Sequence, residues 1–225
     1  MVRLVLFDID GTLIRSGGAG VQAFGRAFAN VFGIDNATHG VSFAGRTDSG
    51  LVRELFVRHG IAHTPENAAA FYERYLFLLH ELLQHAAGHT LPGTHELIAG
   101  FRQLPQPPTL GLLTGNVRLG AEIKLRHYGL WEPFITGAFG DDHECRNELA
   151  AIAQRRGSEL LATSLRGEEI LVIGDTPRDI ECARAIRARC LAVATGGPAF
   201  HELEAHRPTR TVRDLTEVSA EELCR

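Results

Sequence analysis

The sequence lacks several features that mark particular classes of protein. It has a single lysine, Lys124, and its four cysteines include no Cys-x-x-Cys pair. This argues against a zinc site and favours reduced thiols in a cytosol. No apolar run approaches the ~20 residues of a membrane span, and the N-terminal run is too short for a signal peptide and ends in two acids. We therefore expect a soluble, cytoplasmic protein that does not enter a membrane.

Clusters of basic residues are missing as well. The formal charge is −4, and no Lys/Arg run is interleaved with aromatic residues, so nothing favours nucleic acid as a partner. The hydrophobic fraction of 44% and the charged fraction of 22% are ordinary for a globular protein. With 225 residues, the chain fits one core domain that carries a sizeable insertion. Its oligomeric state has no signature in the sequence.

The chain opens on a short apolar run that stops at two acids. Residues 2–7 are typical of a strand buried on both faces, and Asp8 and Asp10 follow it, two positions apart. Two such carboxylates repel each other unless a cation or a proton lies between them. Mg²⁺ prefers carboxylate oxygens together with substrate phosphate and water. A second interpretation stays open, in which the acids only end the strand and start the turn at Gly11.

Two patterns divide the rest of the chain. From about residue 21 to 85, apolar residues recur at three- and four-residue spacing, which indicates three or four helices. Beyond that stretch, helix and strand patterns alternate, which favours a parallel sheet with helices on both faces. We expect helices over 94–103, 117–127, 146–156 and 177–187, and strands over 109–114, 134–138, 169–174 and 190–194.

These patterns predict an α/β fold with a Rossmann-like parallel core and an inserted, all-helical cap. The core would consist of residues 1–15 and 90–225, and the cap of residues 16–89. The glycine-rich residues 16–20 would then be a flexible connection between the two.

Polar residues follow three of the expected strands, at the edge where ligands bind in open α/β sheets. After the strand over 109–114, Thr114-Gly115-Asn116 offers side-chain and backbone donors suited to an oxyanion. After the strand over 169–174 stands Asp175, a third carboxylate that would be costly beside the first two without a cation. The sequence therefore predicts one polar site at this edge.

Asp179 has two possible roles. Thr176 can cap the helix that follows, with Pro177 as its first residue, so that Asp179 completes a capping box. A role in metal binding is an equal alternative.

Two residues compete as the cation of this site. We favour Arg146 because it opens a helix at the sheet edge, whereas Lys124 lies two turns into its helix, too far from the edge. In the cap, Thr47 or Asp48 can cap a helix beginning near residue 49. The neighbouring loop residue Arg46 either binds an anionic group by bidentate hydrogen bonds or remains solvated.

With these motifs, the chain resembles the haloacid-dehalogenase-like hydrolase superfamily, and within it the phosphoglycolate-phosphatase-like branch. The resemblance covers almost the whole chain and rests on four motifs in the family's order. These are Asp8-Ile9-Asp10-Gly11-Thr12, Leu113-Thr114-Gly115-Asn116, Arg146, and Gly174-Asp175-Thr176-Pro177-Arg178-Asp179. Family members usually carry lysine at the third motif, so Arg146 is assigned by position.

The resemblance implies a two-step phosphatase acting on a small phosphomonoester. Asp8 would attack phosphorus and become an aspartyl phosphate, while Asp10 would protonate the leaving alcohol and then activate water. Thr114 and Arg146 would bind the transferring phosphoryl group, with Gly115 and Asn116 in the substrate site.

The resemblance also implies Mg²⁺ as cofactor. Its ligands would be Asp8, the backbone carbonyl of Asp10 and Asp175, with Asp179 supporting them. Closure of the cap would exclude water and present Arg46 to the substrate.

Three alternatives remain from the sequence. A haloacid dehalogenase uses the same nucleophile but has no leaving alcohol to protonate, so Asp10 argues against it. A sugar phosphomutase shares the acid pair and the cap, although Thr12 in the first motif favours hydrolysis by resemblance. A phospho-accepting receiver module also clusters acids at a sheet edge, but the cap-sized insertion argues against it.

Overall fold

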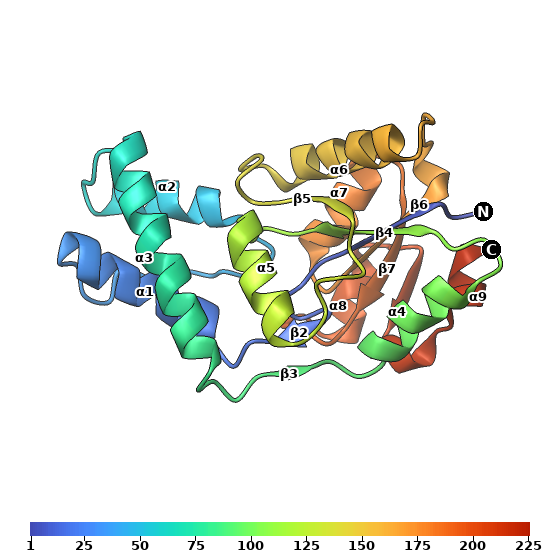
Figure 1. Cartoon of the computed structure of the whole chain (residues 1–225), viewed down its shortest axis with the longest axis horizontal. Coiled ribbons are helices and arrows are strands. Elements are labelled where there is room, and N and C mark those ends of the chain that lie inside the picture. The colour runs from blue at the N-terminus through green and yellow to red at the C-terminus, as the bar shows by residue number, and fades with distance from the viewer.

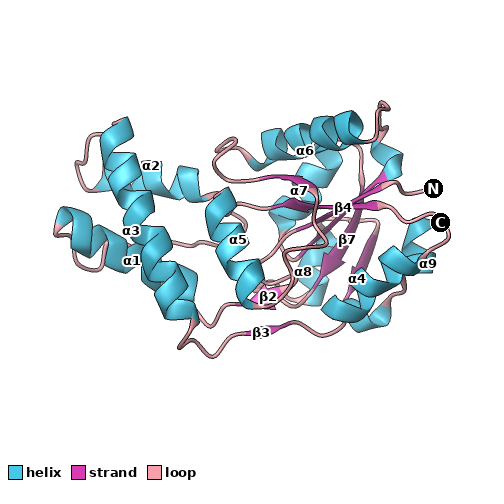
Figure 2. Cartoon of the chain, viewed as in Figure 1, coloured by secondary structure: helices cyan, strands magenta, loops and turns pink.

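The structure, a computed structural model, describes residues 1–225. Three helices lie to one side of a larger part that contains a sheet and the other helices (Figures 1 and 2). The strands are β1 (Leu4–Phe7), β2 (Ile14–Arg15), β3 (His89–Thr90), β4 (Thr109–Leu113), β5 (Thr136–Ala138), β6 (Ile170–Gly174), β7 (Arg189–Val193) and β8 (Arg210–Val212). The α-helices are α1 (Ala19–Phe32), α2 (Asp48–Arg58), α3 (Pro65–Leu83), α4 (Thr94–Gln103), α5 (Arg118–His127), α6 (Arg146–Leu160), α7 (Pro177–Ala185), α8 (Phe200–Ala205) and α9 (Ala220–Cys224).

Six parallel strands form the main sheet, in the order β5-β4-β1-β6-β7-β8. β1 lies in the middle, with β4 on one side and β6 on the other. After β1 the chain adds β4 and β5 on one side, and it then returns to add β6, β7 and β8 on the other side. The strand order therefore reverses at β1. In such sheets the carboxyl ends around this reversal are where ligands bind, so the segments after β1, β4 and β6 share one edge.

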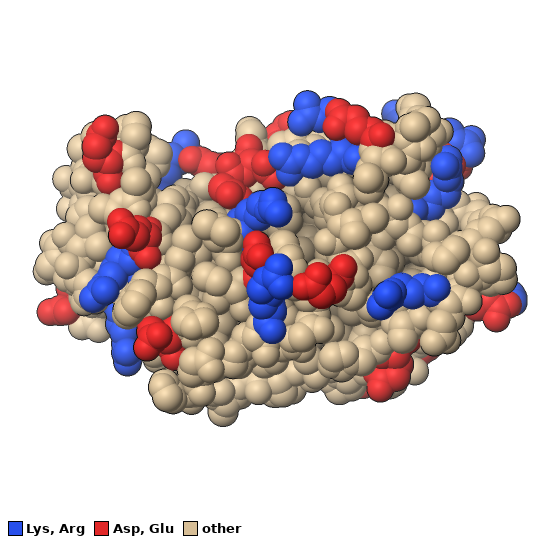
Figure 3. Space-filling model, in the orientation of Figure 1, with Lys and Arg blue, Asp and Glu red and all other residues tan.

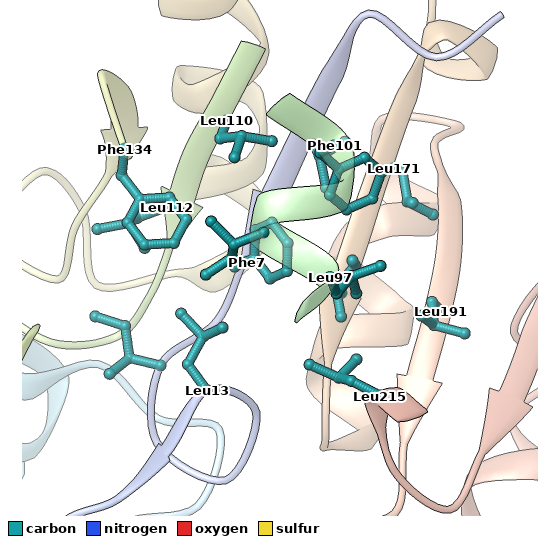
Figure 4. Close-up of a cluster of buried hydrophobic side chains, with 14 of the residues drawn as sticks. Phe7, Leu13, Leu97, Phe101, Leu110, Leu112, Phe134, Leu171, Leu191 and Leu215 are labelled. Atoms are coloured by element: carbon teal, nitrogen blue, oxygen red, sulfur yellow. The ribbon is translucent and has the colours of Figure 1, made fainter. Parts of the chain in front are cut away.

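The neighbouring strands β1 and β6 are buried on both faces, as the apolar run after Met1 indicates for β1. Val5 and Phe7 point into a cluster covered by α4, α5 and α9, and Leu4 and Leu6 into a second one covered by α6, α7 and α8. Figure 4 shows Phe7 at the centre of the first cluster. Phe101 and Phe134 contact its ring edge to face, at 6.1 and 5.7 Å between centroids. This packing fixes the strand whose end carries the acids.

Helices α1, α2 and α3 form a third hydrophobic cluster of their own. Phe24 lies in its middle and contacts Phe43, Phe71 and Tyr75 at 4.8–5.3 Å between ring centroids. Aromatic stripes on the three helices supply this cluster, as the spacing in the sequence predicts. Among its buried members, only Val117 comes from outside the three helices and their connections.

Two connections join this helical unit to the sheet. Where they leave the core they pair as the antiparallel strands β2 and β3, with Ile14 opposite Thr90 and Arg15 opposite His89. Beyond this pairing, Gly17 and Gly18 adopt positive φ values of 61° and 82°. These are conformations that glycine enters without steric cost. The pairing holds the two connections together at the entrance to the helical unit.

The predicted fold class, a parallel α/β core with helices on both faces, is confirmed. Most expected elements fall within a few residues of the observed ones, and the helix over 94–103 is found with the same bounds. The helices of the insertion number three, and the last ends at Leu83. The sequence did not indicate β8, α8 or α9, because the two helices, of six and five residues, span less than two turns, and in β8 only Val212 is buried. No helix is both long and apolar enough to cross a membrane.

Candidate active site

Three buried carboxylates meet at the carboxyl edge of the sheet. Asp8 follows β1, Asp175 follows β6, and Asp179 lies in the first turn of α7. One oxygen of each lies within 4.8 Å of the others. The structure thus brings together three acids that the sequence assigned to a metal site. The carboxylate of the fourth, Asp10, is not part of this group, in keeping with the expectation that its backbone carbonyl is the ligand.

The burial of these acids opposes their ionisation. Burial raises the pKa of Asp8 to about 6, with the charge of Asp179 adding to the shift and that of Arg146 opposing it. Burial, followed by the charges of Asp179 and Asp8, raises the pKa of Asp175 well above its ordinary range. Such a cluster is stabilised by positive charge placed among the carboxylates.

Arg146 supplies part of that charge. It opens α6, is 7% exposed, and its Nη2 lies 3.1 Å from Oδ1 of Asp8. The same nitrogen contacts Oδ1 of Asp179 and donates to the backbone oxygen of Leu113 at 3.2 Å. Nε of Arg146 is buried without a hydrogen-bond partner. Arg146 therefore lies inside the site, as its position at the start of a helix predicts.

The residues fit a divalent cation. Three carboxylates against one guanidinium leave two negative charges in a buried cluster. Oxygen donors of this type are those that Mg²⁺ prefers. A cation of this charge would balance the cluster and oppose the rise that burial causes in the pKa values of Asp8 and Asp175.

Asp179 completes the predicted capping box. Its Oδ2 accepts from the backbone N–H of Thr176 at 2.9 Å and from the Thr176 hydroxyl at 2.7 Å. Its other oxygen contacts Arg146. Since both oxygens already have partners, the geometry favours Asp179 as a residue that orients Arg146 over a direct metal ligand.

Asp175 is held by Thr12, which the sequence indicated only as part of the first motif. The hydroxyl of Thr12, which is fully buried, donates to Oδ1 of Asp175 at 2.9 Å. Gly11 has a φ of +87°, and a Cβ at this position would lie 2.4 Å from Oδ2 of Asp175. Glycine is therefore required at the turn after β1 both by its backbone conformation and by the carboxylate beside it.

The expectation that Lys124 lies too far from the sheet edge is wrong. Its Nζ lies 2.6 Å from Oδ2 of Asp10 and 2.6 Å from Oδ1 of Asn116. Helical side chains point back toward the N-terminus of their helix. The four-carbon stem of lysine therefore recovers much of the roughly 9 Å that separates residue 124 from the start of α5. The sequence could have indicated this contact, because a helix that starts at the sheet edge points its long side chains back toward that edge. The distance along the helix axis takes no account of that direction.

Thr114, Gly115 and Asn116 lie in the site as expected. The Thr114 hydroxyl, fully buried, accepts from the Asn116 side chain at 2.9 Å. That side-chain nitrogen also lies 2.9 Å from Oδ2 of Asp10. Burial acts to raise the pKa of Asp10, but the charge and hydrogen bonds of Lys124, joined by Asn116, outweigh it, so the pKa is lowered.

The start of α2 docks on the sheet edge. Thr47 caps this helix through its hydroxyl, and the backbone N–H of Asp48 donates to the carbonyl of Gly115 at 2.7 Å. A Cβ on Gly115 would lie 1.9 Å from the backbone oxygen of Arg46, so only glycine admits the loop this closely. The Arg46 guanidinium itself forms an ion pair with Glu54 of α2. Arg46 therefore lines the cleft, but its charge is already paired with that of Glu54.

Asp48 is a buried residue of the site that the sequence offered only as a helix cap. Its Oδ2 accepts from the backbone N–H of Val117 at 2.9 Å, just before α5 begins. Burial raises the pKa of Asp48 to about 6, while the nearby charge of Lys124 opposes the shift. The carboxylate thus joins the start of α2 to the start of α5 in a place where burial makes its charge unfavourable.

We expect Asp48→Asn to stabilise the protein at pH 8. A folded-state pKa above the ordinary aspartate value of 3.8 means that the folded state binds the proton more tightly. Stability is therefore lost as the pH rises from about 4 to about 6. Asparagine removes the charge and keeps an acceptor for Val117, so the free energy of unfolding should rise by up to about 3 kcal/mol at pH 8.

Urea unfolding at pH 4 and pH 8 measures this effect. The gain should disappear at pH 4. Asp141→Asn is the matched control, because Asp141 also accepts a backbone hydrogen bond, from Arg118 at 2.9 Å, but is exposed. An equal gain at both pH values would contradict the assignment of the effect to the Asp48 charge.

The helical unit and the sheet edge together line a cleft of about 590 Å³. The core contributes Asp8, Asp10, Thr114, Lys124 and Arg146 to its lining. The helical unit contributes mainly apolar and aromatic side chains, among them Phe24, Phe43, Leu51 and Tyr75. On the face of the molecule in Figure 3, charges of both signs are interspersed. The buried charges of Asp8, Asp175 and Arg146 line the cleft instead.

Buried carboxylates that open on a covered cleft at the reversal point of a parallel sheet are characteristic of an enzyme with an α/β core. The chain belongs to the haloacid dehalogenase-like hydrolase family, whose model matches residues 5–184. The predicted resemblance is thus confirmed, and the protein is an enzyme of the hydrolase class. The family assignment argues against the receiver-type alternative.

Two curated relatives bear the names of phosphatases. The chain is 27% identical over 225 residues to "Probable phosphatase IndB" of Dickeya dadantii, covering 97% of this chain and 92% of the relative. It is 29% identical over 196 residues to "Phosphoglycolate phosphatase" of Synechococcus elongatus, covering 87% and 85% of the two chains.

Solved structures share the fold. CbbY from Rhodobacter sphaeroides, in complex with phosphate, superposes with a TM-score of 0.76 at 21% identity and covers 96% of both chains. A predicted phosphoglycolate phosphatase from Haemophilus somnus gives 0.70 at 17% identity, covering 99% of this chain and 96% of that one. A putative β-phosphoglucomutase from Thermotoga maritima gives a TM-score of 0.60 at 18% identity, covering 99% of this chain and 97% of that one.

Proposed function

We propose that this protein is a Mg²⁺-dependent phosphatase that hydrolyses a small phosphomonoester through an aspartyl phosphate on Asp8. One observation carries the proposal. The Asp8 carboxylate stands at the end of the central strand, among two further acids and Arg146, and it lines the cleft beneath the helices. The names of the curated relatives support the same activity.

The first step forms the covalent intermediate. An oxygen of Asp8 attacks phosphorus, the bond from phosphorus to the ester oxygen breaks, and Asp10 gives its proton to that oxygen as the alcohol leaves. Arg146 and Thr114, which line the cleft, would donate to the phosphoryl oxygens as charge builds up on them. The nucleophile and the acid come from one strand end, two residues apart.

The second step regenerates Asp8. Asp10, now ionised, accepts a proton from water as the water oxygen attacks phosphorus. The acyl phosphate bond breaks, inorganic phosphate leaves, and Asp8 returns as a carboxylate. Both steps would thus use the same two residues, with Asp10 as the acid in the first and as the base in the second.

Asp8 and Asp175, with the backbone carbonyl of Asp10, would hold the Mg²⁺. The cation would neutralise charge on the phosphoryl oxygens and on the nucleophile, which lowers the repulsion between two anions. Asp179 would act through Arg146, since its other oxygen caps α7.

Residues 16–89 would form the cap, and residues 1–15 and 90–225 the core. The apolar wall of the cap, which includes Phe24 and Phe43, would exclude water from the intermediate. Arg46 would reach an anionic part of the substrate only by leaving its ion pair with Glu54.

The test is a steady-state phosphatase assay on a panel of small phosphomonoesters, with Mg²⁺ and with a chelator. The panel includes phosphoglycolate, sugar phosphates and p-nitrophenyl phosphate. We also include xylulose 1,5-bisphosphate, because one solved CbbY structure carries it. Chelation should lower turnover by at least about 100-fold, because the cation contributes several kcal/mol of charge stabilisation.

Three results would contradict the proposal. Turnover unaffected by chelation would exclude the metal role. Transfer of phosphate to a second sugar hydroxyl without release would favour the mutase, and halide release from 2-chloropropionate without metal would favour the dehalogenase.

A further inference from the structure

Lys124 is the one buried cationic side chain of the cleft that the proposed mechanism leaves without a role. It is 4% exposed, although it lies within the second turn of α5. Its Nζ contacts the carboxylate of Asp10 and the amide oxygen of Asn116, each at 2.6 Å. A buried lysine with charged and polar partners is held in one position, because breaking either contact would leave charge unpaired in a poorly solvated place.

Lys124, Asn116 and Asp10 form a hydrogen-bonded triangle that involves only one oxygen of the Asp10 carboxylate. Lys124 and the Asn116 side-chain nitrogen both donate to Oδ2, at 2.6 and 2.9 Å. Asn116 is itself fixed, since it donates to the Thr114 hydroxyl and accepts from Lys124. Neither donor contacts Oδ1 of Asp10. The Asp10 side chain keeps 39% exposure, so its outer part faces the cleft.

The helical unit closes over this network. A Cβ on Gly20 of α1 would lie 3.4 Å from Nζ of Lys124, so the first turn of α1 passes directly over the ammonium group. Asp48 contributes a further negative charge near it from α2. Lys124 thus lies where the helical unit meets the sheet, in contact with Asp10 and close to the first turn of α1.

From this geometry we infer that Lys124 is a positioning residue for Asp10. Resting on the proposed function, the inference is that Lys124 and Asn116 hold Oδ2 and thereby aim Oδ1 at the ester oxygen in the first step and at the attacking water in the second. The side chain of an unrestrained aspartate turns between rotamers. Proton transfer needs the donor within hydrogen-bond reach of its acceptor in a fixed direction.

The leaving group of the substrate separates this role from others. A p-nitrophenolate leaves without a proton, whereas an alkoxide needs one. If Lys124 aims Asp10, its loss slows the first step for alkyl phosphates only. If Lys124 binds the transferring phosphoryl group, its loss slows the first step for both kinds of ester.

The experiment compares wild type and Lys124→Met, with Mg²⁺ present, on an alkyl phosphate and on p-nitrophenyl phosphate. For the alkyl ester, kcat/KM should fall by about 100-fold, the lower end of the contribution of general acid catalysis. For the aryl ester, kcat/KM should change by no more than about threefold. Its kcat should fall, because Asp10 also serves the second step, and rapid mixing should show a burst of p-nitrophenolate.

Arg126→Met is the matched control. It removes a cation from the same helix, but Arg126 is exposed and pairs with Glu122 and Glu132. Both kinetic constants should stay as in wild type on both esters.

Chemical rescue tests the inference in a second variant. Ethylammonium added to Lys124→Ala should restore kcat/KM for the alkyl ester, and should restore nothing when Asp10→Asn is added to that variant. An equal loss on both esters, or a missing burst together with a missing rescue, would overturn the inference while leaving the phosphatase function intact. A wild-type protein without turnover on any ester would overturn both.

Discussion

Replacing Asp8 by asparagine is expected to abolish turnover, by on the order of 10⁴-fold or more, because the variant has no carboxylate to attack phosphorus. Asparagine has nearly the same shape and can still accept from Arg146, whose Nη2 lies 3.1 Å from Oδ1 of Asp8. The fold should therefore persist. The loss is measured as kcat on the best ester of the panel, with Mg²⁺ in excess.

The same variant should be more stable than wild type when Mg²⁺ is absent. Burial raises the pKa of Asp8 to about 6, so its ionisation at pH 8 opposes folding, and the amide removes that charge. Enzymes commonly hold such unfavourable groups in the site where they act. Thermal unfolding in chelator at pH 8 measures the difference.

Asp35→Asn is the matched control for this variant. It makes the same chemical change on an exposed residue between α1 and α2. Neither turnover nor stability should change. If Asp8→Asn kept substantial activity that chelation still removed, Asp8 would not be the nucleophile.

Replacing Arg146 by alanine is expected to damage both catalysis and folding. The guanidinium lies between Asp8 and Asp179, with 6% side-chain exposure, and removing it leaves the carboxylates without a compensating charge. The free energy of unfolding should fall by about 3–5 kcal/mol, as for other broken buried pairs. Turnover should fall by on the order of 10²–10³-fold, as for the loss of one donor to a developing charge.

Two further variants isolate the cause. Arg146→Lys restores a charge at the position where family members usually carry lysine, and it should recover part of both losses. Arg155→Ala removes an exposed arginine from the same helix and should change neither quantity. Urea unfolding and kcat on one ester provide both readouts. Wild-type turnover in Arg146→Ala would remove Arg146 from the mechanism.

These expectations differ from the sequence-based choice between two cations. The sequence alone treated Arg146 and Lys124 as rivals for one role. The structure places Arg146 beside Asp8 and Lys124 beside Asp10. Both are buried in the site, and the two variants should fail in different ways: loss of Arg146 on every ester, and loss of Lys124 mainly where the leaving group needs a proton.

The sequence by itself determined the features that depend on neighbours along the chain. The strand that ends at Asp8, the capping box of Thr176 and Asp179, and the alternation of helix and strand all follow from local patterns. The aromatic stripes of the helical insertion do so too. These patterns fixed the fold class and brought the carboxylates to one sheet edge, because parallel strands all end there.

Only the tertiary structure decided which of those groups touch. Thr12 bonds to Asp175 across 163 positions, Lys124 to Asp10 across 114, and Val117 to Asp48 across 69. Such contacts depend on the tilt of α5, the direction of a long side chain and the docking of α2. A spacing in the sequence records none of these. The reason is physical: a period describes one element, whereas a contact between two elements is set by how both pack.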